Sequence, residues 1–331
     1  MRRRIFPILL SLALVITMIP AFSMTSFADE GEPYYVWVAG TWVTDANKND
    51  VLGDGTVSFD PDSHTLTLKN ANIVGKVYSP SYSGGIILSP KGDYDTFTIR
   101  LEGKNTVTSA YSENNSYGIL MTGWTQRALI FTGPGSLDVA SDTAKTGDSN
   151  AISSYGKLII ESGTIRATGG SAKRFRCGIN GDYGVNIRGG DIRAGVSAPV
   201  EEDCYGIRCY SGGIRIQGGT VQVSGGIVGS GEGRPSKAFI AEPDLSGYPG
   251  TPSVLWSSDA SGAGAKTWNG IPNLSNSGVQ YVTISPEGSG GSNPFVDISK
   301  GDYWYGPILW AYNHETHQQI GKLLVLKTCF Y

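Results

Sequence analysis

The sequence contains little of what a helical, a nucleic-acid-binding or a metal-rich protein needs. Among 331 residues there are 4 methionines, 3 histidines and 4 cysteines, and charged residues make up 17%. The 26 basic residues face 29 acidic ones, so there is no basic excess to neutralise phosphates, and binding of nucleic acid is disfavoured. Glycine is abundant, with 46 residues, which favours a turn-rich all-β chain.

A long apolar run occurs only at the start of the chain. Arg2-Arg3-Arg4 precede the run from Ile5 to Phe22, and Ser26-Phe27-Ala28 offers small residues where a signal peptidase cleaves. We expect residues 1–28 to be a cleaved signal peptide. An uncleaved membrane anchor is the alternative, but two prolines interrupt a run that is already short for a span. The expected product is a mildly acidic, secreted protein with no transmembrane segment.

Glycine-centred strand segments recur along the middle of the chain. The five segments are Phe97–Thr108, Ala128–Val139, Lys157–Ala167, Val185–Ala194 and Gly213–Val223. The last apolar residue before the glycines marks the same place in each segment (Leu101, Phe131, Ile160, Ile187, Ile216). Successive marker residues are 30, 29, 27 and 29 residues apart. A near-constant period of this size predicts stacked repeats, because no single repeat can bury a core alone.

Each repeat carries three groups of apolar residues at matching places. One group precedes the glycines, a second follows them (Val107, Leu137, Ile165, Ile192, Val221), and a third precedes the next turn (Ile119, Ile152, Ile179, Ile207). Three strands per repeat predict a right-handed parallel β-helix of about 28 residues per coil, with coils about 4.8 Å apart. A propeller is the alternative, but its units of four strands need about 40 residues or more.

The segments that flank the repeats are predicted to close the β-helix, which we place at residues 34–285. An N-terminal β cap is expected from a strand at Tyr34–Val43 and a hairpin of Thr56–Phe59 with Thr65–Leu68. Two further strands, Val254–Trp256 and Val279–Ile284, are expected at the other end. Residues 286–294 have the composition of a flexible linker.

Four cysteines in an exported chain raise the question of disulfides. The repeat frame aligns Cys177 with Tyr205, and strict alternation then places Cys177 and Cys209 on one face of the strands and Cys204 on the other. We therefore predict small packing residues or free thiols. Cys329 lies outside the repeats, and the spacing does not decide its state.

The C-terminal segment, residues 295–331, resembles the opening of an S-layer homology (SLH) module. The resemblance rests on a Phe-x-Asp-Ile phrase and on an aromatic cluster before a short helix (Phe295, Asp297, Trp304, Tyr305, Trp310). It implies a protein tethered to secondary cell-wall polymer at the surface of a bacterium. The later SLH phrases, including a Thr-Arg-Ala-Glu helix start, are missing. We therefore expect a truncated, partly helical module.

The front of the chain is similar to secreted β-helical proteins of Gram-positive bacteria that are described as carbohydrate-binding domain-containing. The similar phrases are Val36–Gly40, Val51–Asp60 and Thr65–Ala71, and with the repeats they extend the resemblance over residues 34–285. The resemblance implies a polysaccharide partner. It brings no catalytic residues with it.

Two sets of outward residues are candidates for contact with a polysaccharide. Aromatic residues near the turns can lie against sugar rings, or else stack on one another at a corner (Trp124, Tyr155, Tyr183, Tyr210). A polar column can bind uronic-acid carboxylates through Arg166 and Arg193, or else form a solvated face (Thr108, Asp138, Arg166, Arg193, Gln222). Arg100, Asn186 and Arg215 are expected on a neighbouring strand.

Catalytic and metal-binding motifs are weak. No pair of carboxylates aligns on adjacent coils as glycoside hydrolysis requires, so an enzyme is not favoured. An oxygen-rich loop can either hold Ca²⁺ or form Asx turns (Asp45, Asn47, Asn49, Asp50, Asp54). The sequence thus predicts a secreted or wall-associated, non-catalytic polysaccharide-binding protein. The alternatives are a polysaccharide lyase or glycoside hydrolase on the same fold, and a structural adhesin or spacer.

Overall fold

The computed structural model describes residues 32–90, 96–123, 127–196, 203–225, 237–239, 241–276 and 278–287. Outside these residues lie the predicted signal peptide, Trp124, Cys329, the linker from residue 288 on, and the SLH-like residues (Phe295, Asp297, Trp304, Tyr305, Trp310). Within the described residues there is no helix at all, and so none that is long and apolar enough to cross a membrane.

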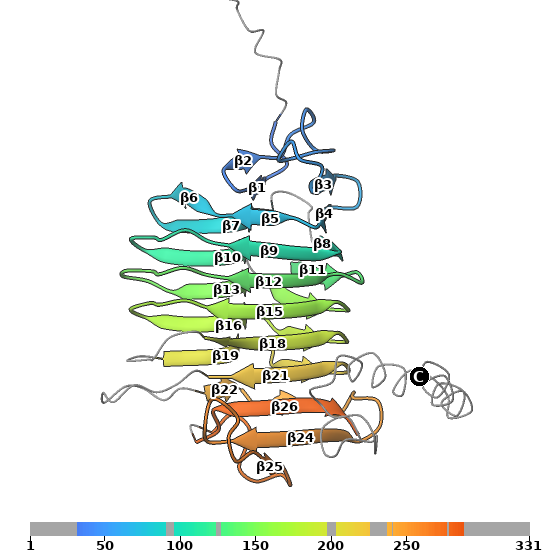
Figure 1. Ribbon diagram of the computed structural model, residues 1–331, viewed down its shortest axis with the longest axis vertical. Helices are drawn as coiled ribbons and strands as arrows, with labels where there is room; N and C mark the ends of the chain where they lie inside the picture. Colours follow the sequence, from blue (N-terminus) through green and yellow to red (C-terminus); the bar gives the residue numbers. More distant parts are fainter. Residues whose placement is uncertain are drawn as a thin grey trace, which may run out of the picture.

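The described chain is a β-solenoid of about five coils, in which each full coil adds one strand to each of three sheets (Figure 1). Sheet A has the order β2 (Thr41–Trp42), β1 (Val36–Val38), β7 (Tyr82–Leu88), β10 (Asn115–Met121), β13 (Ser149–Ser154), β16 (Phe175–Gly181), β19 (Asp203–Cys209), β22 (Lys237–Phe239), with β6 (Lys76–Ser79) paired to β7.

Sheets B and C follow the same stacking. Sheet B has the order β23 (Pro243–Asp244), β20 (Ile214–Ile216), β17 (Val185–Ile187), β14 (Lys157–Ile160), β11 (Ala128–Thr132), β8 (Thr96–Glu102), β4 (Thr65–Lys69), β3 (Val57–Asp60). Sheet C has the order β25 (Lys266–Thr267), β24 (Pro252–Ser257), β26 (Tyr281–Pro286), β21 (Thr220–Ser224), β18 (Asp191–Val196), β15 (Thr164–Gly169), β12 (Ser136–Ala140), β9 (Lys104–Thr108), β5 (Asn72–Val74). The predicted all-β parallel β-helix is therefore confirmed.

Apolar side chains form continuous ladders down the interior. Ile119, Ile152, Ile179 and Ile207 are paired from coil to coil in sheet A, and all four are fully buried. In sheet B the ladder of Ile160, Ile187 and Ile216 is also in register. These predicted columns are confirmed, and each buried isoleucine contributes about 1.5–3 kcal/mol to folding.

The predicted alignment of the first coil is wrong by two residues. Phe131 pairs with Ile99 rather than with Leu101, because β8 extends past Ile99 and buries Leu101 opposite Leu68 of the N-terminal hairpin. In sheet C the same offset pairs Val107 with Val139. The chain therefore advances further between the first coils than the period suggests.

This offset places a buried asparagine in the interior of sheet C, opposite Leu137. The Asn105 side chain is fully buried; its Oδ1 accepts the Ala71 N–H at 2.8 Å, and its Nδ2 donates to Glu102 O and Ser136 O. The amide therefore joins three neighbouring turns of the chain.

We expect Asn105→Leu to lower the free energy of unfolding by about 3 kcal/mol, since it leaves the buried Ala71 N–H without its acceptor and removes the side-chain hydrogen bonds to the Glu102 and Ser136 carbonyls. Urea unfolding followed by circular dichroism measures the change. Thr108→Ala, at an exposed position of the same strand, is the matched control and should change stability by less than about 0.5 kcal/mol. Equal effects of the two substitutions would contradict the assigned role.

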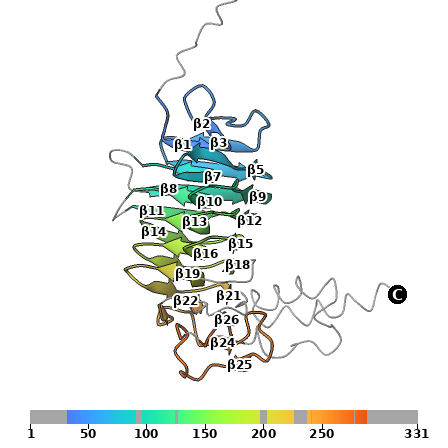
Figure 2. The same ribbon diagram turned by 90° about the vertical axis from the view of Figure 1, so that its left-hand side faces the viewer.

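Both ends of the solenoid are closed by antiparallel strands (Figure 2). The predicted hairpin is confirmed as β3 and β4. The single strand expected at Tyr34–Val43 is instead a hairpin of β1 and β2, which turns at Ala39 and Gly40, both with positive φ. At the other end β26 pairs antiparallel with β21 and with β24, as the predicted closing strands require.

The described cysteines are free thiols, as predicted. Cys177, Cys204 and Cys209 are buried, and burial raises the pKa of Cys177 to about 12, so this thiol stays protonated and unreactive at neutral pH. Cys177 pairs with Tyr205 as expected.

The predicted face of Cys177 is wrong, because strict alternation breaks at a small residue, glycine or alanine, in the middle of strands β7, β10, β13, β16 and β19. In β10, Tyr117 belongs to an outer aromatic cluster, whereas Ile119 and Met121 belong to the core. Cys177 occupies the position of Tyr117 in its own coil, and the core cluster includes Cys209 but not Cys177.

Candidate functional site

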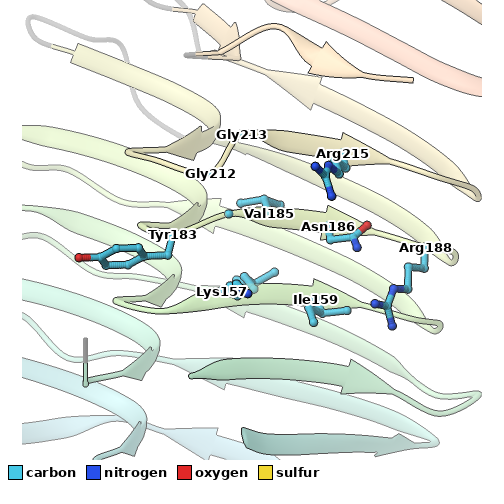
Figure 3. Close-up of a pocket in the computed structure, with 11 residues that line it drawn as sticks. Lys157, Ile159, Tyr183, Val185, Asn186, Arg188, Gly212, Gly213 and Arg215 are labelled. Atoms are coloured by element: carbon cyan, nitrogen blue, oxygen red, sulfur yellow. The ribbon is translucent and has the colours of Figure 1, made fainter. Parts of the chain in front are cut away.

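A hollow of about 420 Å³ lies on the outer face of sheet B, over β14, β17 and β20 (Figure 3). Its lining residues come from three consecutive coils: Lys157, Leu158, Ile159, Tyr183, Gly184, Val185, Asn186, Arg188, Gly212, Gly213 and Arg215. Tyr183 stands at one end of the hollow, before β17, and Arg188 stands at the other end, after β17 (Figure 3). The hollow therefore extends along the whole length of these short strands.

Glycines create this hollow. Lys157 occupies the start of its strand, and the same position is Gly184 one coil later and Gly213 two coils later, so two side chains are missing from this column. Gly213 has φ +81°, and a Cβ atom added to it would meet no atom within 4 Å. Positive φ favours glycine, and its missing side chain leaves open space beside Tyr183.

The lining is basic and carries no acid among its described residues. Its cations are Lys157, Arg188 and Arg215, and its uncharged polar side chains are Asn186 and Tyr183, whose hydroxyl points away from the cations (Figure 3). The Asn186 Oδ1 atom is buried and accepts no hydrogen bond. Ile159 adds an apolar surface between them, and Asn186 and Arg215 are direct neighbours in the ladder. Such a mixture suits a ligand that has anionic groups and also apolar faces.

The tyrosines predicted from their spacing fall into two different columns. Tyr155 and Tyr210 occupy the position that Asp182 occupies in the coil between them, whereas Tyr183 lies one residue further along its coil. Tyr183 is half-buried and lines the hollow. Tyr210 is 80% exposed, with the Arg208 guanidinium 5.9 Å from its ring centre. The structure therefore does not bring the three rings together.

The predicted arginine column lies on another face, the outer side of sheet C. Asp138, Arg166, Arg193 and Gln222 are in register as expected, but Thr106 rather than Thr108 pairs with Asp138. Arg166 and Arg193 are exposed, and Arg166 Nη1 lies 3.4 Å from Asp138 Oδ1. Neither arginine lines the hollow of sheet B. Arg100 is on β8 of sheet B, two coils before the hollow.

Sequence reasoning missed a series of aromatic rings on the outer face of sheet A. Tyr78 stacks on Tyr82 at 5.2 Å, Tyr82 meets Tyr117 edge-on at 6.2 Å, and the Tyr117 hydroxyl is hydrogen-bonded to Tyr155. Trp42 extends the series at the N-terminal end, 5.6 Å from Tyr78. Burial raises the pKa of Tyr82 to about 12. For Tyr155, the structure thus shows packing of aromatic side chains on one another.

A network of polar groups follows this aromatic series on the next coils of sheet A. Asn180 Nδ2 donates to Ser153 and Asp182, and Arg208 donates to Asn180 Oδ1 at 2.7 Å. Asp148 lies on the same face, and burial raises the pKa of its carboxyl. The Arg208 guanidinium is 3.5 Å from Asp182, so this network balances its own charges.

The oxygen-rich N-terminal loop uses its side chains in turns. Asn47 Oδ1 accepts the Thr44 N–H at 2.8 Å, and Asp50 Oδ1 accepts the N–H groups of Asp54 and Gly55. Asp45 accepts the Tyr34 hydroxyl and the Lys48 ammonium, which lower its pKa. Within the described residues no cluster of three or more His, Cys, Asp or Glu is placed to hold a metal. Ca²⁺ binding by this loop stays a prediction.

The hollow residues Lys157 and Arg188 were not predicted as a site, although Lys157 begins β14 and Arg188 directly follows β17, each beside a buried apolar residue. The sequence indicates that both side chains point outward, but the space beside them depends on glycines of later coils.

A family model described as carbohydrate-binding domain-containing protein matches residues 38–232, which is more than half of the chain. No curated protein and no solved structure gives a significant match.

Proposed function

The chain belongs to the family of carbohydrate-binding domain-containing proteins, and from this premise we propose that it binds an acidic polysaccharide in the hollow on sheet B. The observation that carries the proposal is the grouping of three cations, Lys157, Arg188 and Arg215, around open space beside Tyr183. Uronic-acid units offer a carboxylate to the cations and an apolar ring face to tyrosine.

We propose further that binding is non-catalytic. The described lining residues of the hollow include no Asp or Glu that can act as acid, base or nucleophile in glycoside hydrolysis. The hollow is also open along the strands, which suits an extended chain held at several units. These features support a binding surface, rather than a lyase or hydrolase site.

We also propose that the protein works outside the cell, secreted or attached to the wall. Support comes from the sequence: the export-signal pattern of residues 1–28 and the SLH-like segment with Phe295, Asp297 and Trp304. A secondary cell-wall polymer is the partner that this segment implies. Reading the coding DNA beyond residue 313 in the other frames tests this part, because a restored Thr-Arg-Ala-Glu helix start supports attachment.

We expect Lys157→Met with Arg215→Met to weaken binding to polygalacturonate at least about tenfold, because the lost charge-assisted hydrogen bond to Lys157 alone is worth about that factor. Affinity electrophoresis in gels with and without polygalacturonate measures the retardation. The same samples, read for unsaturated uronides, should show no cleavage.

The matched control is Arg166→Met with Arg193→Met, which removes the same charge from sheet C, away from the hollow. This variant should keep most of the wild-type retardation. Equal losses in both variants would mean that net charge alone attracts the polymer, and the proposed site would be withdrawn. The absence of any retardation of the wild-type protein would overturn the proposed ligand class.

A further inference from the structure

Two of the three cations in the hollow are already paired with acids of the protein itself. Arg188 Nη1 donates to Glu161 Oε1 at 3.2 Å, and Arg215 Nε lies 3.8 Å from Asp244 Oδ2. Lys157 forms no ion pair within the described part of the chain. Three cations and two flanking acids leave this region with a net charge of about +1.

The ladder holds these acids beside the arginines. Asp244 is the direct register partner of Arg215 on the next coil, and Glu161 precedes Arg188 by one coil. One acid therefore stands on the N-terminal side of the hollow and the other on its C-terminal side. Asp244 is oriented further by the Ser246 N–H, which donates to its Oδ1 at 2.9 Å.

Both ion pairs are weak enough to exchange. The side chains of Arg188, Glu161, Arg215 and Asp244 are 42–64% exposed, and pairs of this kind contribute about 0–1 kcal/mol. A ligand carboxylate that binds either arginine must displace the protein's own carboxylate. The exchange yields little free energy per site, so a single carboxylate gains little beyond its contact with Lys157.

We propose that Glu161 and Asp244 are built-in competitors of the ligand, which set the selectivity of the hollow for chains with several closely spaced carboxylates over singly charged sugars. This inference rests on the proposed function, because it concerns the same hollow. A chain places many carboxylates near both arginines at once, and this high local concentration favours displacement of both acids. A monomer has no such advantage.

We expect Glu161→Gln with Asp244→Asn to strengthen binding of trigalacturonate about tenfold, which is about threefold for each acid removed. Binding of long polygalacturonate should strengthen less, so that the preference for the polymer falls. Isothermal titration calorimetry with both probes, at one fixed salt concentration, measures the two affinities. Circular dichroism checks that the exposed substitutions leave the fold intact.

The matched control is Asp138→Asn, which frees Arg166 from an equivalent 3.4 Å ion pair on sheet C. It should leave both affinities unchanged. The inference is overturned if Glu161→Gln with Asp244→Asn does not strengthen trigalacturonate binding, or if Asp138→Asn strengthens it equally. Binding by the double variant but not by the wild type would keep the inference and remove the proposed function. If neither protein binds either probe, both proposals fail.

Discussion

Gly118→Ala should lower the free energy of unfolding by about 3 kcal/mol, although it adds a single methyl group. A Cβ atom at Gly118 would lie 2.5 Å from Val139 Cγ2 and 2.6 Å from the Ala151 carbonyl oxygen. Both neighbours are fixed by ladders of adjacent coils, so the strand cannot shift without breaking the register. Urea unfolding monitored by circular dichroism measures the loss.

The neighbouring coil supplies the control for this prediction. Ala151 takes the place of Gly118 one coil later, and there Ala167 stands in register with Val139. The interior thus combines glycine with valine in one coil and alanine with alanine in the next. We therefore expect Val139→Ala, which alone costs about 2 kcal/mol, to relieve part of the Gly118→Ala defect.

The double variant should consequently lose less than the sum of the two single variants, with a coupling of at least about 1 kcal/mol. Strictly additive losses would show that the Ala151 carbonyl, and not Val139, limits the space at Gly118. In that case Gly118→Ala would be destabilising for a reason that side-chain volume does not explain.

The interior of the solenoid could be predicted because its ladders repeat with the chain. Regular spacing, together with the small residue before each isoleucine, predicts the pairing of Ile119, Ile152 and Ile179. The predicted pairing of Leu101 with Phe131 was wrong because Leu101 is buried against the hairpin strand β4 instead. The sequence indicates that an apolar residue is buried, but it does not indicate which residue packs against it.

The surface was harder to predict, because an error of one residue in the alignment of two coils assigns a side chain to the wrong part of the surface. Tyr155 and Tyr183 are 28 residues apart, yet Ser154 pairs with Gly181, so this coil advances by 27 residues. The difference of one residue sends Tyr155 to the aromatic series of sheet A and Tyr183 to the hollow of sheet B. The register of the arginine column was predicted correctly because the strands of sheet C keep a common register from coil to coil.

The hollow depends on glycines, and a side chain added at Gly213 should therefore have a large effect on binding. Gly213→Asp should weaken binding to polygalacturonate at least about tenfold, because it places a carboxylate in the open space between Lys157 and Arg215. That carboxylate repels the ligand and also pairs with the cations that the ligand needs. Affinity electrophoresis against polygalacturonate measures the effect.

Gly213→Asn is the isosteric control for this prediction. Asn and Asp have nearly the same size, and both tolerate the positive φ of +81° at this position better than other residues do. The asparagine variant should keep its affinity within about threefold of the wild type, because it adds bulk without charge. If both variants lose binding equally, the hollow selects its ligand by shape; if neither loses it, the polysaccharide binds elsewhere. Only a loss confined to the aspartate variant makes the charge around Gly213 the property that the acidic chain recognises.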